Sequence, residues 1–305
     1  MEGRKALFFV KQGIPIAMQR VVIIHQSRLP HAPQVAEQLG AVVMRQGGNV
    51  TVHSSWDQFF KDVDLGITDL IISVGGDGTI LRIARAVASW KIPILGVNMG
   101  RLGFITEIEA EEAADKLPLF LEGRGWVEER TMVEVRMGLF QGVALNEAVV
   151  SRDGPVRTVQ IAIRVNGEVM TTYRGDGAIV ATATGSTAYA LSAGGPVLEP
   201  ESRGLVVKPL SPHLALDRAM VVEGDGAVDI QVGTDHGAVL SLDGQEDVPV
   251  SDGAVVTVRR SPHAARFLRL RPRGYFYAMA AGLLSKAIPV PPSPADTFPL
   301  PTERH

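Results

Sequence analysis

A short segment with catalytic potential, Gly75-Gly76-Asp77-Gly78-Thr79, stands between an apolar run and an amphipathic stretch. Glycines permit positive φ angles and let the backbone approach a bulky anion, and a helix start offers unpaired N–H groups to phosphate. Phosphate should repel Asp77, unless a divalent cation lies between them or the carboxylate meets a hydroxyl. Both possibilities point to phosphoryl transfer.

Other motifs of similar appearance fail at particular positions. The dinucleotide fingerprint G-x-G-x-x-G is broken because Leu81 stands where its third glycine belongs. No Gly-Lys pair is present for a Walker loop, and neither H-E-x-x-H nor G-x-S-x-G occurs. The structural alternative is a tight strand–helix turn in which Asp77 caps the helix. The pentapeptide alone does not decide between this alternative and catalysis.

The elements that must position this segment alternate between two periods. "RVVIIHQ" (20–26) and "DLIISVGG" (69–76) are Val- and Ile-rich runs, typical of strands buried on both faces. Residues 30–47 and 79–90 have a helical pattern, and "KIPILGVNMGRLGFITE" (91–107) supplies a further strand ending in a Gly-rich loop. This order predicts a parallel α/β sheet, with Asp77 at the carboxyl end of a strand, where such folds bind ligands.

The second half has a different character. From Trp126 to about Arg271, short alternating runs are separated by turn pairs such as Asn166-Gly167 and Asp252-Gly253, which predicts an all-β domain. Helical pattern returns at "YFYAMAAGLLSKAI" (275–288). The predicted organisation is an extension at 1–17, an α/β domain at 18–125 with 272–288 packing back on it, a β-rich domain at 126–271, and a disordered Pro-rich tail at 289–305.

Composition excludes several classes of protein. The 305 residues carry a net charge of −3, so no global basic field gathers nucleic acid or anionic membrane. The chain has no cysteine, which excludes disulfides, thiolate metal sites and a cysteine nucleophile. No apolar run reaches the roughly 18–20 residues of a membrane span. We expect a soluble cytoplasmic protein without nucleic-acid or membrane partners.

Five further segments follow the Gly-Gly-Asp-Gly-Thr loop in a characteristic order. They are "GVNMGRLGFITE" (96–107), "LNEAVVSR" (145–152), "YRGDGAIVATATGSTAYALSAGGPVLEP" (173–200), "PLSPH" (209–213) and "DGQ" (243–245). With these motifs the chain strongly resembles the NAD kinase family from about Gln19 to Leu284. The resemblance implies ATP-dependent phosphorylation of the adenosine-ribose 2′-hydroxyl of NAD, which gives NADP.

The resemblance also assigns roles to residues of this chain. It implies that Asp77 takes or orients the proton of the hydroxyl, and that the β domain grips NAD. Mg²⁺ is expected to be bound mainly through the ATP phosphates, near Asp77, and no ligand set is assigned. The substrate- and nucleotide-binding positions it implies are Gly76, Gly78, Thr79, Arg82, Asn146, Glu147, Arg157, Arg174, Asp176, Thr187, Ala188, Tyr189, Ala190, Leu191, Ser192 and Gln245.

These residue types suit their roles, although each has a structural alternative. Asn146 and Glu147 can bind adenine edges or ribose hydroxyls, or can form an ordinary hairpin end. Arg157, like Arg174, suits a pyrophosphate or a 2′-phosphate, but Arg157 can also be a solvated surface arginine. Tyr189 offers a flat face for a base, or belongs to the core.

Departures from the family pattern and rival functions remain. Ala183 replaces a usual proline and is expected to loosen its turn, Leu214 replaces a common serine, and Ala219 a frequent proline. Residues 1–17 have no family counterpart, so Met18 is a candidate initiator. Lipid kinases and phosphofructokinases carry related loops, and a non-catalytic NADP(H) sensor is the alternative from another class. A homo-oligomer, dimer or tetramer, is expected.

Overall fold

The computed structural model describes residues 18–55, 63–100, 103–154, 157–213 and 217–285. The chain divides into two units, residues 1–271 and residues 272–305, and each is described by itself. The predicted extension at 1–17, the tail at 289–305 and Leu214 lie outside the described residues.

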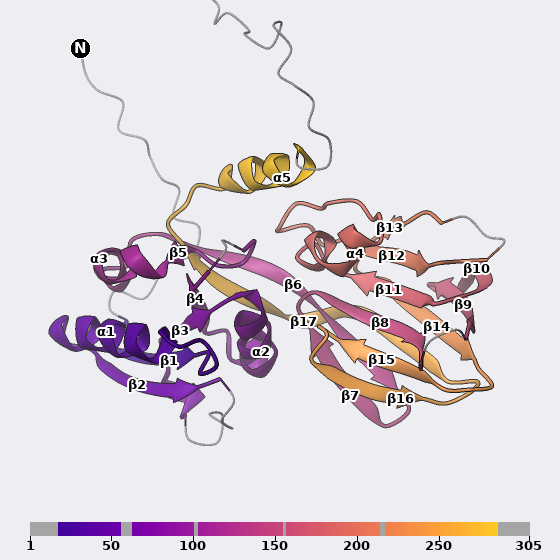
Figure 1. Cartoon of the computed structure of the whole chain (residues 1–305), viewed down its shortest axis with the longest axis horizontal. Helices are drawn as coiled ribbons and strands as arrows, with labels where there is room; N and C mark the ends of the chain where they lie inside the picture. The colour runs from indigo at the N-terminus through magenta and orange to yellow at the C-terminus, as the bar shows by residue number, and fades with distance from the viewer. Residues whose placement is uncertain (1–17, 56–62, 101–102, 155–156, 214–216, 286–305) are drawn as a thin grey trace, which may run out of the picture. The chain divides into compact units, whose positions relative to one another are not determined.

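The first part of the chain forms a parallel sheet covered by helices (Figure 1). Its strands lie in the order β4-β3-β1-β2, and all of their neighbours are parallel. The strands are β1 (Arg20–His25), β2 (Asn49–Ser54), β3 (Leu70–Gly75) and β4 (Pro93–Asn98), and the helices are α1 (Ala32–Arg45), α2 (Asp77–Val87) and α3 (Ala110–Leu121). The predicted α/β domain is confirmed.

Alternation along the strands distributes apolar side chains to both faces. In β1, Val21 and Ile23 pack with α1 and α3, whereas Val22 and Ile24 pack with α2. Such two-sided burial is why these strands appear in the sequence as continuous Val- and Ile-rich runs. Helix α3 was not among the predicted elements, and it begins with a capping box between Glu109 and Glu112.

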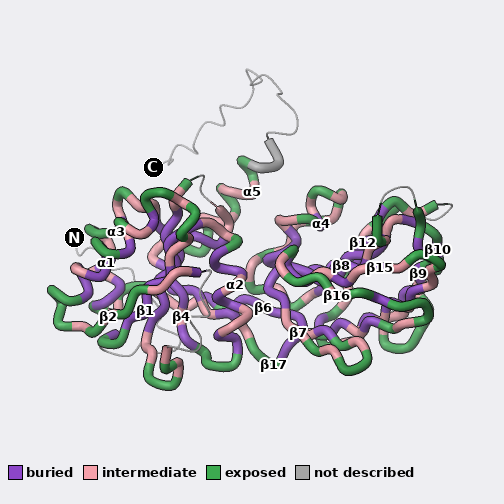
Figure 2. Tube along the Cα trace, turned by 60° about the horizontal axis from the view of Figure 1, so that its bottom comes forward, coloured by how far each residue is buried: buried purple, intermediate pink, exposed green. Residues whose placement is uncertain are grey.

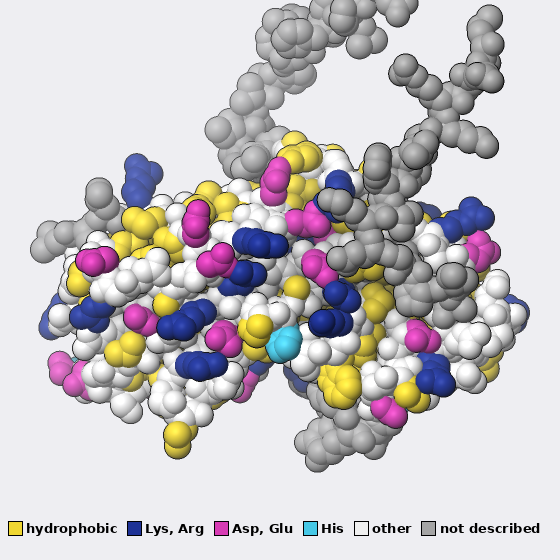
Figure 3. Space-filling view, turned by 180° about the vertical axis from the view of Figure 1, so that it is seen from behind, with side chains coloured by type: hydrophobic (Ala, Val, Ile, Leu, Met, Phe, Trp, Pro, Cys, Tyr) yellow, Lys and Arg dark blue, Asp and Glu magenta, His cyan; other side chains and the backbone are white. Residues whose placement is uncertain are grey.

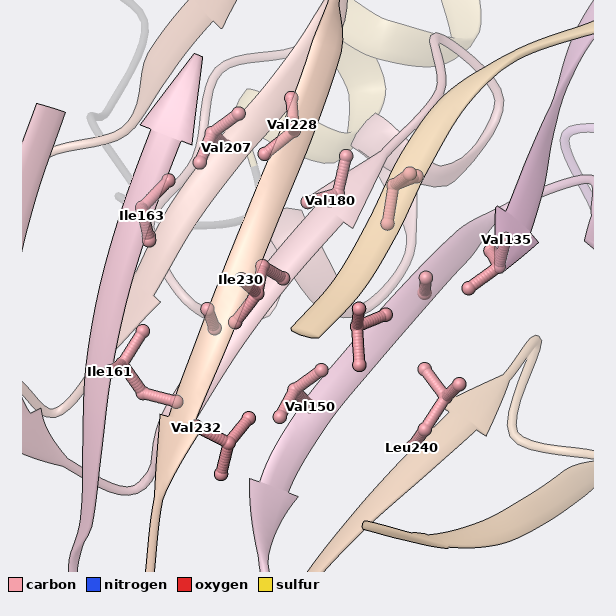
Figure 4. Packing of buried hydrophobic residues seen from close by; sticks show 14 of the residues in the cluster. Val135, Val150, Ile161, Ile163, Val180, Val207, Val228, Ile230, Val232 and Leu240 are labelled. Atoms are coloured by element: carbon pink, nitrogen blue, oxygen red, sulfur yellow. The ribbon is translucent and has the colours of Figure 1, made fainter. Parts of the chain in front are cut away.

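The second part of the chain is a β sandwich, which confirms the predicted all-β region. One sheet has the order β13-β12-β11-β8-β15-β16, and the other joins β10, β9 and β14 to β17, with β6 and β7 beside it. Figure 4 shows Ile161 and Ile230 of one sheet pointing toward Val150, Val180 and Leu240 of the other. The strands are β6 (Trp126–Met137), β7 (Phe140–Ala144), β8 (Glu147–Arg152), β9 (Val159–Val165), β10 (Glu168–Gly175), β11 (Gly177–Ala181), β12 (Leu205–Leu210), β13 (Met220–Val222), β14 (Ala227–Gly233), β15 (Ala238–Leu242), β16 (Glu246–Val250) and β17 (Val255–Arg269).

Two long strands, β6 and β17, run through both regions. Near its start β17 pairs with β14 of the sandwich, and near its end Arg266 and Phe267 pair with Pro93 and Ile94 of β4. One sheet of 11 strands therefore crosses the predicted boundary at residues 125 and 126, with the short β5 (Ile108–Glu109) beside β4. The α/β region is completed by a strand from the far end of the chain.

The remaining elements are short or belong to the second unit. Turns of 3-10 helix occupy Leu65–Ile67, Ala88–Trp90 and Gly185–Thr187, followed by the one-turn helix α4 (Tyr189–Ser192). The predicted C-terminal helix is present as α5 (Tyr275–Ser285), and its docking on the first domain stays a prediction. No helix in the described part of the chain has both the length and the apolar character needed to cross a membrane.

Burial and charge follow this layout. Strands such as β4 and β8 are mostly buried, whereas exposed segments gather on loops and outer helix faces (Figure 2). On the face of the molecule in Figure 3, Lys and Arg side chains are interspersed with Asp and Glu side chains.

Candidate active site

Asp77 lies at the junction between the end of β3 and the start of α2. Gly76 is the N-cap of α2 and Asp77 its first residue, and the helix start has no side-chain cap. The Asp77 carboxylate instead accepts a hydrogen bond at Oδ2 from the backbone N–H of Phe104, at 3.2 Å. Its Oδ1 is buried and has no hydrogen-bond partner among the described residues. The helix-cap alternative is therefore wrong, and one carboxylate oxygen remains available for a ligand.

The loop glycines serve different purposes. A Cβ on Gly103 would lie 2.2 Å from Asp77 Oδ1, so only glycine lets this backbone approach the carboxylate. A Cβ on Gly76 or Gly78 would meet nothing within 4 Å. Neither residue has a positive φ, and Gly76 is extended at φ −112°, so these positions do not use the positive φ that glycine permits. What these two glycines provide is bare backbone beside Asp77.

The charge state of Asp77 is set by opposing influences. Burial raises the pKa of its carboxyl above the ordinary value, while the backbone N–H groups of Ile105, Phe104 and Thr106 and the positive charge of Arg269 lower it. Thr79, in contrast, is 5% exposed, and its hydroxyl packs against Gly75. Thr79 thus shapes the turn from inside the fold.

Asn146 and Glu147 form a second polar group at the start of β8. Asp243 lies in the left-handed region at φ 54°. Its carboxylate accepts backbone hydrogen bonds from Leu145 (2.9 Å), Asn146 (2.7 Å) and Glu147 (3.2 Å). This fixes the backbone, while Oδ1 of Asn146 and Oε2 of Glu147 are buried without hydrogen-bond partners in the described part of the chain. Buried acceptors are normally satisfied, so both point to a ligand.

The environment of Glu147 favours its neutral form. Burial, with a further contribution from the charge of Asp243, raises the pKa of Glu147 to about 8, although the backbone N–H of Tyr189 acts in the opposite direction. Burial also raises the pKa of Asp243. Near neutral pH the Glu147 carboxyl is therefore mostly protonated and can donate a hydrogen bond as well as accept one.

The start of the segment from Thr182 to Ser192 packs directly on Asn146, through Thr182 and Gly185. Thr182 donates from N to Asn146 O at 2.8 Å and from Oγ1 to Leu145 O at 2.6 Å, and a Cβ on Gly185 would lie 2.1 Å from Asn146 O. Tyr189 is 48% exposed, which rules out the core alternative for its ring. Ala190 is buried in a small apolar cluster, while Thr187, Ala188 and Leu191 are half-buried and Ser192 is exposed.

Gln245 joins the two groups. Its Nε2 donates to Gly78 O at 2.7 Å, across a separation of 167 residues. The neighbouring Glu246 forms an ion pair with Arg85 on α2. Arg82, one turn into α2, directs Nη1 toward Ser55 O at 3.5 Å. The turn after β15 therefore lies against the helix that begins at Asp77, and the predicted residues Gln245 and Gly78 meet there.

Three predicted residues lie elsewhere in this chain. Ala181, at one end of β11, pairs with Glu147, whereas Asp176 precedes the other end of that strand. Five residues of extended chain separate Asp176 from Ala181, which corresponds to about 17 Å. There Arg152 Nε donates to the Asp176 carboxylate at 2.6 Å, which together with Ser211 lowers the pKa of Asp176. Arg174 and Arg157 are exposed near the same end. These three form a second cluster, separate from Asp77.

Sequence reasoning missed several residues that build the site. Asp243 lies in the quoted "DGQ" motif and Gly103 in "GVNMGRLGFITE", but neither was given a role. A buried ionic group of Glu107, Glu128, Arg130 and Arg269 lies behind Asp77, and Arg130 Nη1 donates to Thr184 Oγ1 at 3.3 Å. Glu128 and Arg130 alternate on β6, and no motif distinguishes them from other strand residues.

The residues around Asp77 fit a Mg²⁺ ion that is bound mainly by the phosphates of a nucleotide. Among the residues that the structure describes, no three acidic or histidine side chains converge on one point. Asp77 Oδ1 is a single carboxylate oxygen at the loop, and one oxygen does not supply the octahedral set of oxygen ligands that Mg²⁺ takes. A cation here would have to take most of its ligands from phosphates and water.

Comparison with known proteins places this geometry in a family. Residues 5–125 match the family model of the ATP-NAD kinase N-terminal domain, and residues 145–270 match that of the ATP-NAD kinase C-terminal domain. The first match begins at residue 5, so the expectation that residues 1–17 have no family counterpart is wrong from that residue on. The NAD kinase of Dehalococcoides mccartyi (strain CBDB1) is 40% identical over 265 residues, covering 85% of this chain and 93% of that protein. The NAD kinase of Chloroflexus aggregans is 37% identical over 277 residues, covering 88% and 100%.

Solved structures agree with the sequence relatives. An NAD kinase from Archaeoglobus fulgidus in complex with ATP superimposes with a TM-score of 0.73 at 29% identity, covering 88% of this chain and 99% of that one. A yeast NADH kinase complexed with NADH shares the fold, with a TM-score of 0.73 at 22% identity and coverage of 93% and 90%. By its two matched domains and its relatives, the chain belongs to the NAD kinase family.

Proposed function

We propose that Asp77 is the catalytic base of NAD phosphorylation by this chain, with ATP as the phosphoryl donor. As a member of the NAD kinase family the chain is a phosphotransferase with an alcohol group as acceptor. The observation that carries the assignment is the buried, unpartnered Oδ1 of Asp77 beside the bare backbone of Gly76 and Gly78. A hydroxyl can donate to this oxygen while phosphate oxygens approach the loop.

A weak base suffices for this reaction. Phosphoryl transfer passes through a loose transition state, so the attacking hydroxyl stays nearly neutral until late. Asp77 then has to orient the 2′-hydroxyl in line with the γ-phosphate and take its proton as the bond to phosphorus forms. Mg²⁺ held by the phosphates would neutralise charge on the transferred group.

Acceptor binding is assigned to the group around Asn146 and Glu147. Their unpartnered buried oxygens suit adenine-edge donors and ribose hydroxyls, and the exposed ring of Tyr189 suits stacking on a base. Gln245 holds Gly78 by its carbonyl and so links this group to the phosphate loop. The donor is assigned to Gly76, Gly78 and the start of α2, where helix N–H groups attract phosphate.

The second cluster supports a homo-oligomer. Arg157, Arg174 and Asp176 are positions that the family resemblance assigns to substrate, yet they lie at the far end of β11 from Glu147. In an assembly of two or four copies, this cluster of one copy can face the Asp77 site of another. The cytoplasmic location expected from the cysteine-free sequence stays a prediction.

The direct test is an assay of NADP formation from NAD, ATP and Mg²⁺, read by an NADP-specific dehydrogenase. Asp77→Asn keeps the shape of the side chain and removes the base, so turnover should fall by about 10²-fold or more with folding unchanged. Omitting Mg²⁺ should abolish the wild-type reaction. A folded Asp77→Asn enzyme with normal turnover would refute the assigned mechanism, and a wild-type protein that binds NADP without forming it would favour the sensor alternative.

A further inference from the structure

The turn formed by residues 103–106 faces Asp77, and the buried Arg269 binds its opposite side. On its front side, Phe104 N–H donates to Asp77 Oδ2, and the N–H groups of Ile105 and Thr106 also stabilise the carboxylate. On its rear side, Arg269 Nη1 donates to the carbonyl oxygen of Ile105 at 2.7 Å and lies 3.4 Å from that of Thr106. The turn is thus bound through its N–H groups on one side and its carbonyls on the other.

Peptide geometry connects these two sides. The Ile105 carbonyl and the Thr106 N–H belong to one planar trans peptide, so they point in opposite directions. A donor that fixes the carbonyl therefore fixes the N–H on the side of Asp77. The next peptide is held in the same way, because Glu107 N–H donates to Gly96 O at 2.8 Å. The orientation of the Thr106 N–H is therefore set by Arg269 and not by Asp77 alone.

Arg269 is itself locked in place. Its Nε and Nη2 each lie 2.8 Å from Glu128 Oε2, and its Nη1 lies 3.2 Å from Glu107 Oε2. Oε1 of Glu107 accepts from the backbone N–H groups of Leu270 (2.8 Å) and Arg271 (2.7 Å). Arg269, Glu107 and Glu128 are at most 6% exposed. A planar guanidinium with all its partners in place has one orientation here.

We propose that Arg269 is a positioning residue for phosphoryl transfer: by binding the carbonyls of Ile105 and Thr106 it holds the 103–106 turn, and the turn holds the Asp77 carboxylate aimed at the reacting hydroxyl. The proposal rests on the assigned role of Asp77. It also accounts for a buried ionic group that the reaction does not otherwise use. Arg269 does not touch substrate in this arrangement, and it acts through the turn and through its own charge.

The test compares the pH dependence of kcat, at saturating NAD and ATP with Mg²⁺, in wild type, Arg269→Lys and Arg269→Gln. Burial raises the pKa of Asp77, and Arg269 opposes that effect, so its loss should raise the pKa further. The acid limb of the profile should then move to higher pH, further in Arg269→Gln than in Arg269→Lys. At neutral pH kcat should fall by about 10-fold, with KM values changed less than about threefold.

The matched control is Arg266→Gln. Arg266 lies on the same strand and forms an ion pair with Glu129 of β6, as Arg269 does with Glu128, but on the more exposed face. Its acid limb should coincide with that of wild type. A midpoint on the pH axis does not depend on enzyme concentration, so partial unfolding of a variant lowers all rates without moving it. If Arg269→Gln does not fold, Arg269→Lys retains a charge for both glutamates and carries the test.

A second readout needs no activity. In ligand-free enzyme labelled with ¹³C at aspartate, the Asp77 carboxyl signal, assigned by its loss in Asp77→Asn, should titrate at higher pH in the Arg269 variants. Unchanged midpoints in both measurements would overturn the proposal. A separate outcome distinguishes the two hypotheses. If Asp77→Asn keeps wild-type turnover, the proposed catalytic role of Asp77 is wrong. If the Asp77 carboxyl titration is still shifted in the Arg269 variants in that case, Arg269 controls a residue that catalysis does not need.

Discussion

Replacing Glu147 by Gln should stabilise the ligand-free enzyme in alkaline solution. The ordinary pKa of this carboxyl is 4.5, and in the folded protein burial and Asp243 raise it to about 8. Folding therefore favours the protonated form. The stability that depends on this proton is fully present below about pH 4.5 and is lost as the pH rises to about 8.

The magnitude follows from the size of the shift. A change of about 3.5 units at 1.36 kcal/mol per unit corresponds to about 5 kcal/mol above pH 8.5, and to about 3 kcal/mol at pH 7. Glutamine keeps the size and polarity of the neutral acid but has no proton to lose. The variant should therefore match wild type near pH 4, and exceed its free energy of unfolding by these amounts at pH 7 and pH 9.

Urea unfolding at pH 4, 7 and 9, followed by circular dichroism, measures the difference. Glu168→Gln, an exposed position in the β9–β10 hairpin, is the matched control and should stay within about 0.5 kcal/mol of wild type. Equal unfolding free energies of Glu147→Gln and wild type at pH 9 would refute the reasoning. That result would mean that the Glu147 carboxyl is charged in the folded protein at this pH, stabilised by a hydrogen bond to a protein group or to a buried water molecule.

Two further predictions concern the site. Gly103→Ala would place a Cβ 2.2 Å from Asp77 Oδ1, so the carboxylate must move. The kcat should fall by about 10²-fold, with a melting temperature near that of wild type. A kcat within twofold of wild type would contradict this. Asn146→Ala should cost about 1–3 kcal/mol, seen chiefly as a higher KM for NAD, whereas Gly78→Ala should raise chiefly the KM for ATP. If steady-state kinetics with each substrate varied in turn gave the opposite pattern, the two sites would be reversed.

The fold was predictable where a local pattern coincides with an element. The Val- and Ile-rich runs gave β1 and β3, and Asn166-Gly167 gave the β9–β10 turn, where both residues have positive φ. Helix α3 was missed although it begins with a capping box, and it contains Pro118, which weakens a helical pattern. The continuation of one sheet across both regions could not be predicted, because strand pairing over long separations leaves no local signal.

The site, like the fold, was predictable only where its residues lie in a local sequence motif. Asp77, Asn146, Glu147 and Gln245 lie in motifs, and the contact of Gln245 with Gly78 links the two groups, although nothing in their spacing shows how. The contact of Arg269 with Ile105 spans 164 residues, and Arg269 sits in an ordinary alternating strand. The unpartnered oxygens of Asp77 and Glu147 are likewise a property of the assembled environment and not of residue type.

The path of β17 has a consequence for how the protein is made. Phe267 and Leu268, near its end, belong to the two apolar clusters on either face of the parallel sheet. On a ribosome the N-terminal half emerges first, but it cannot close its own core until almost 270 residues have been synthesised. Nascent chains should therefore wait in a partly open state, exposed to chaperones, and fold late and together. For the same reason, residues 18–125 expressed alone should not yield a stable domain.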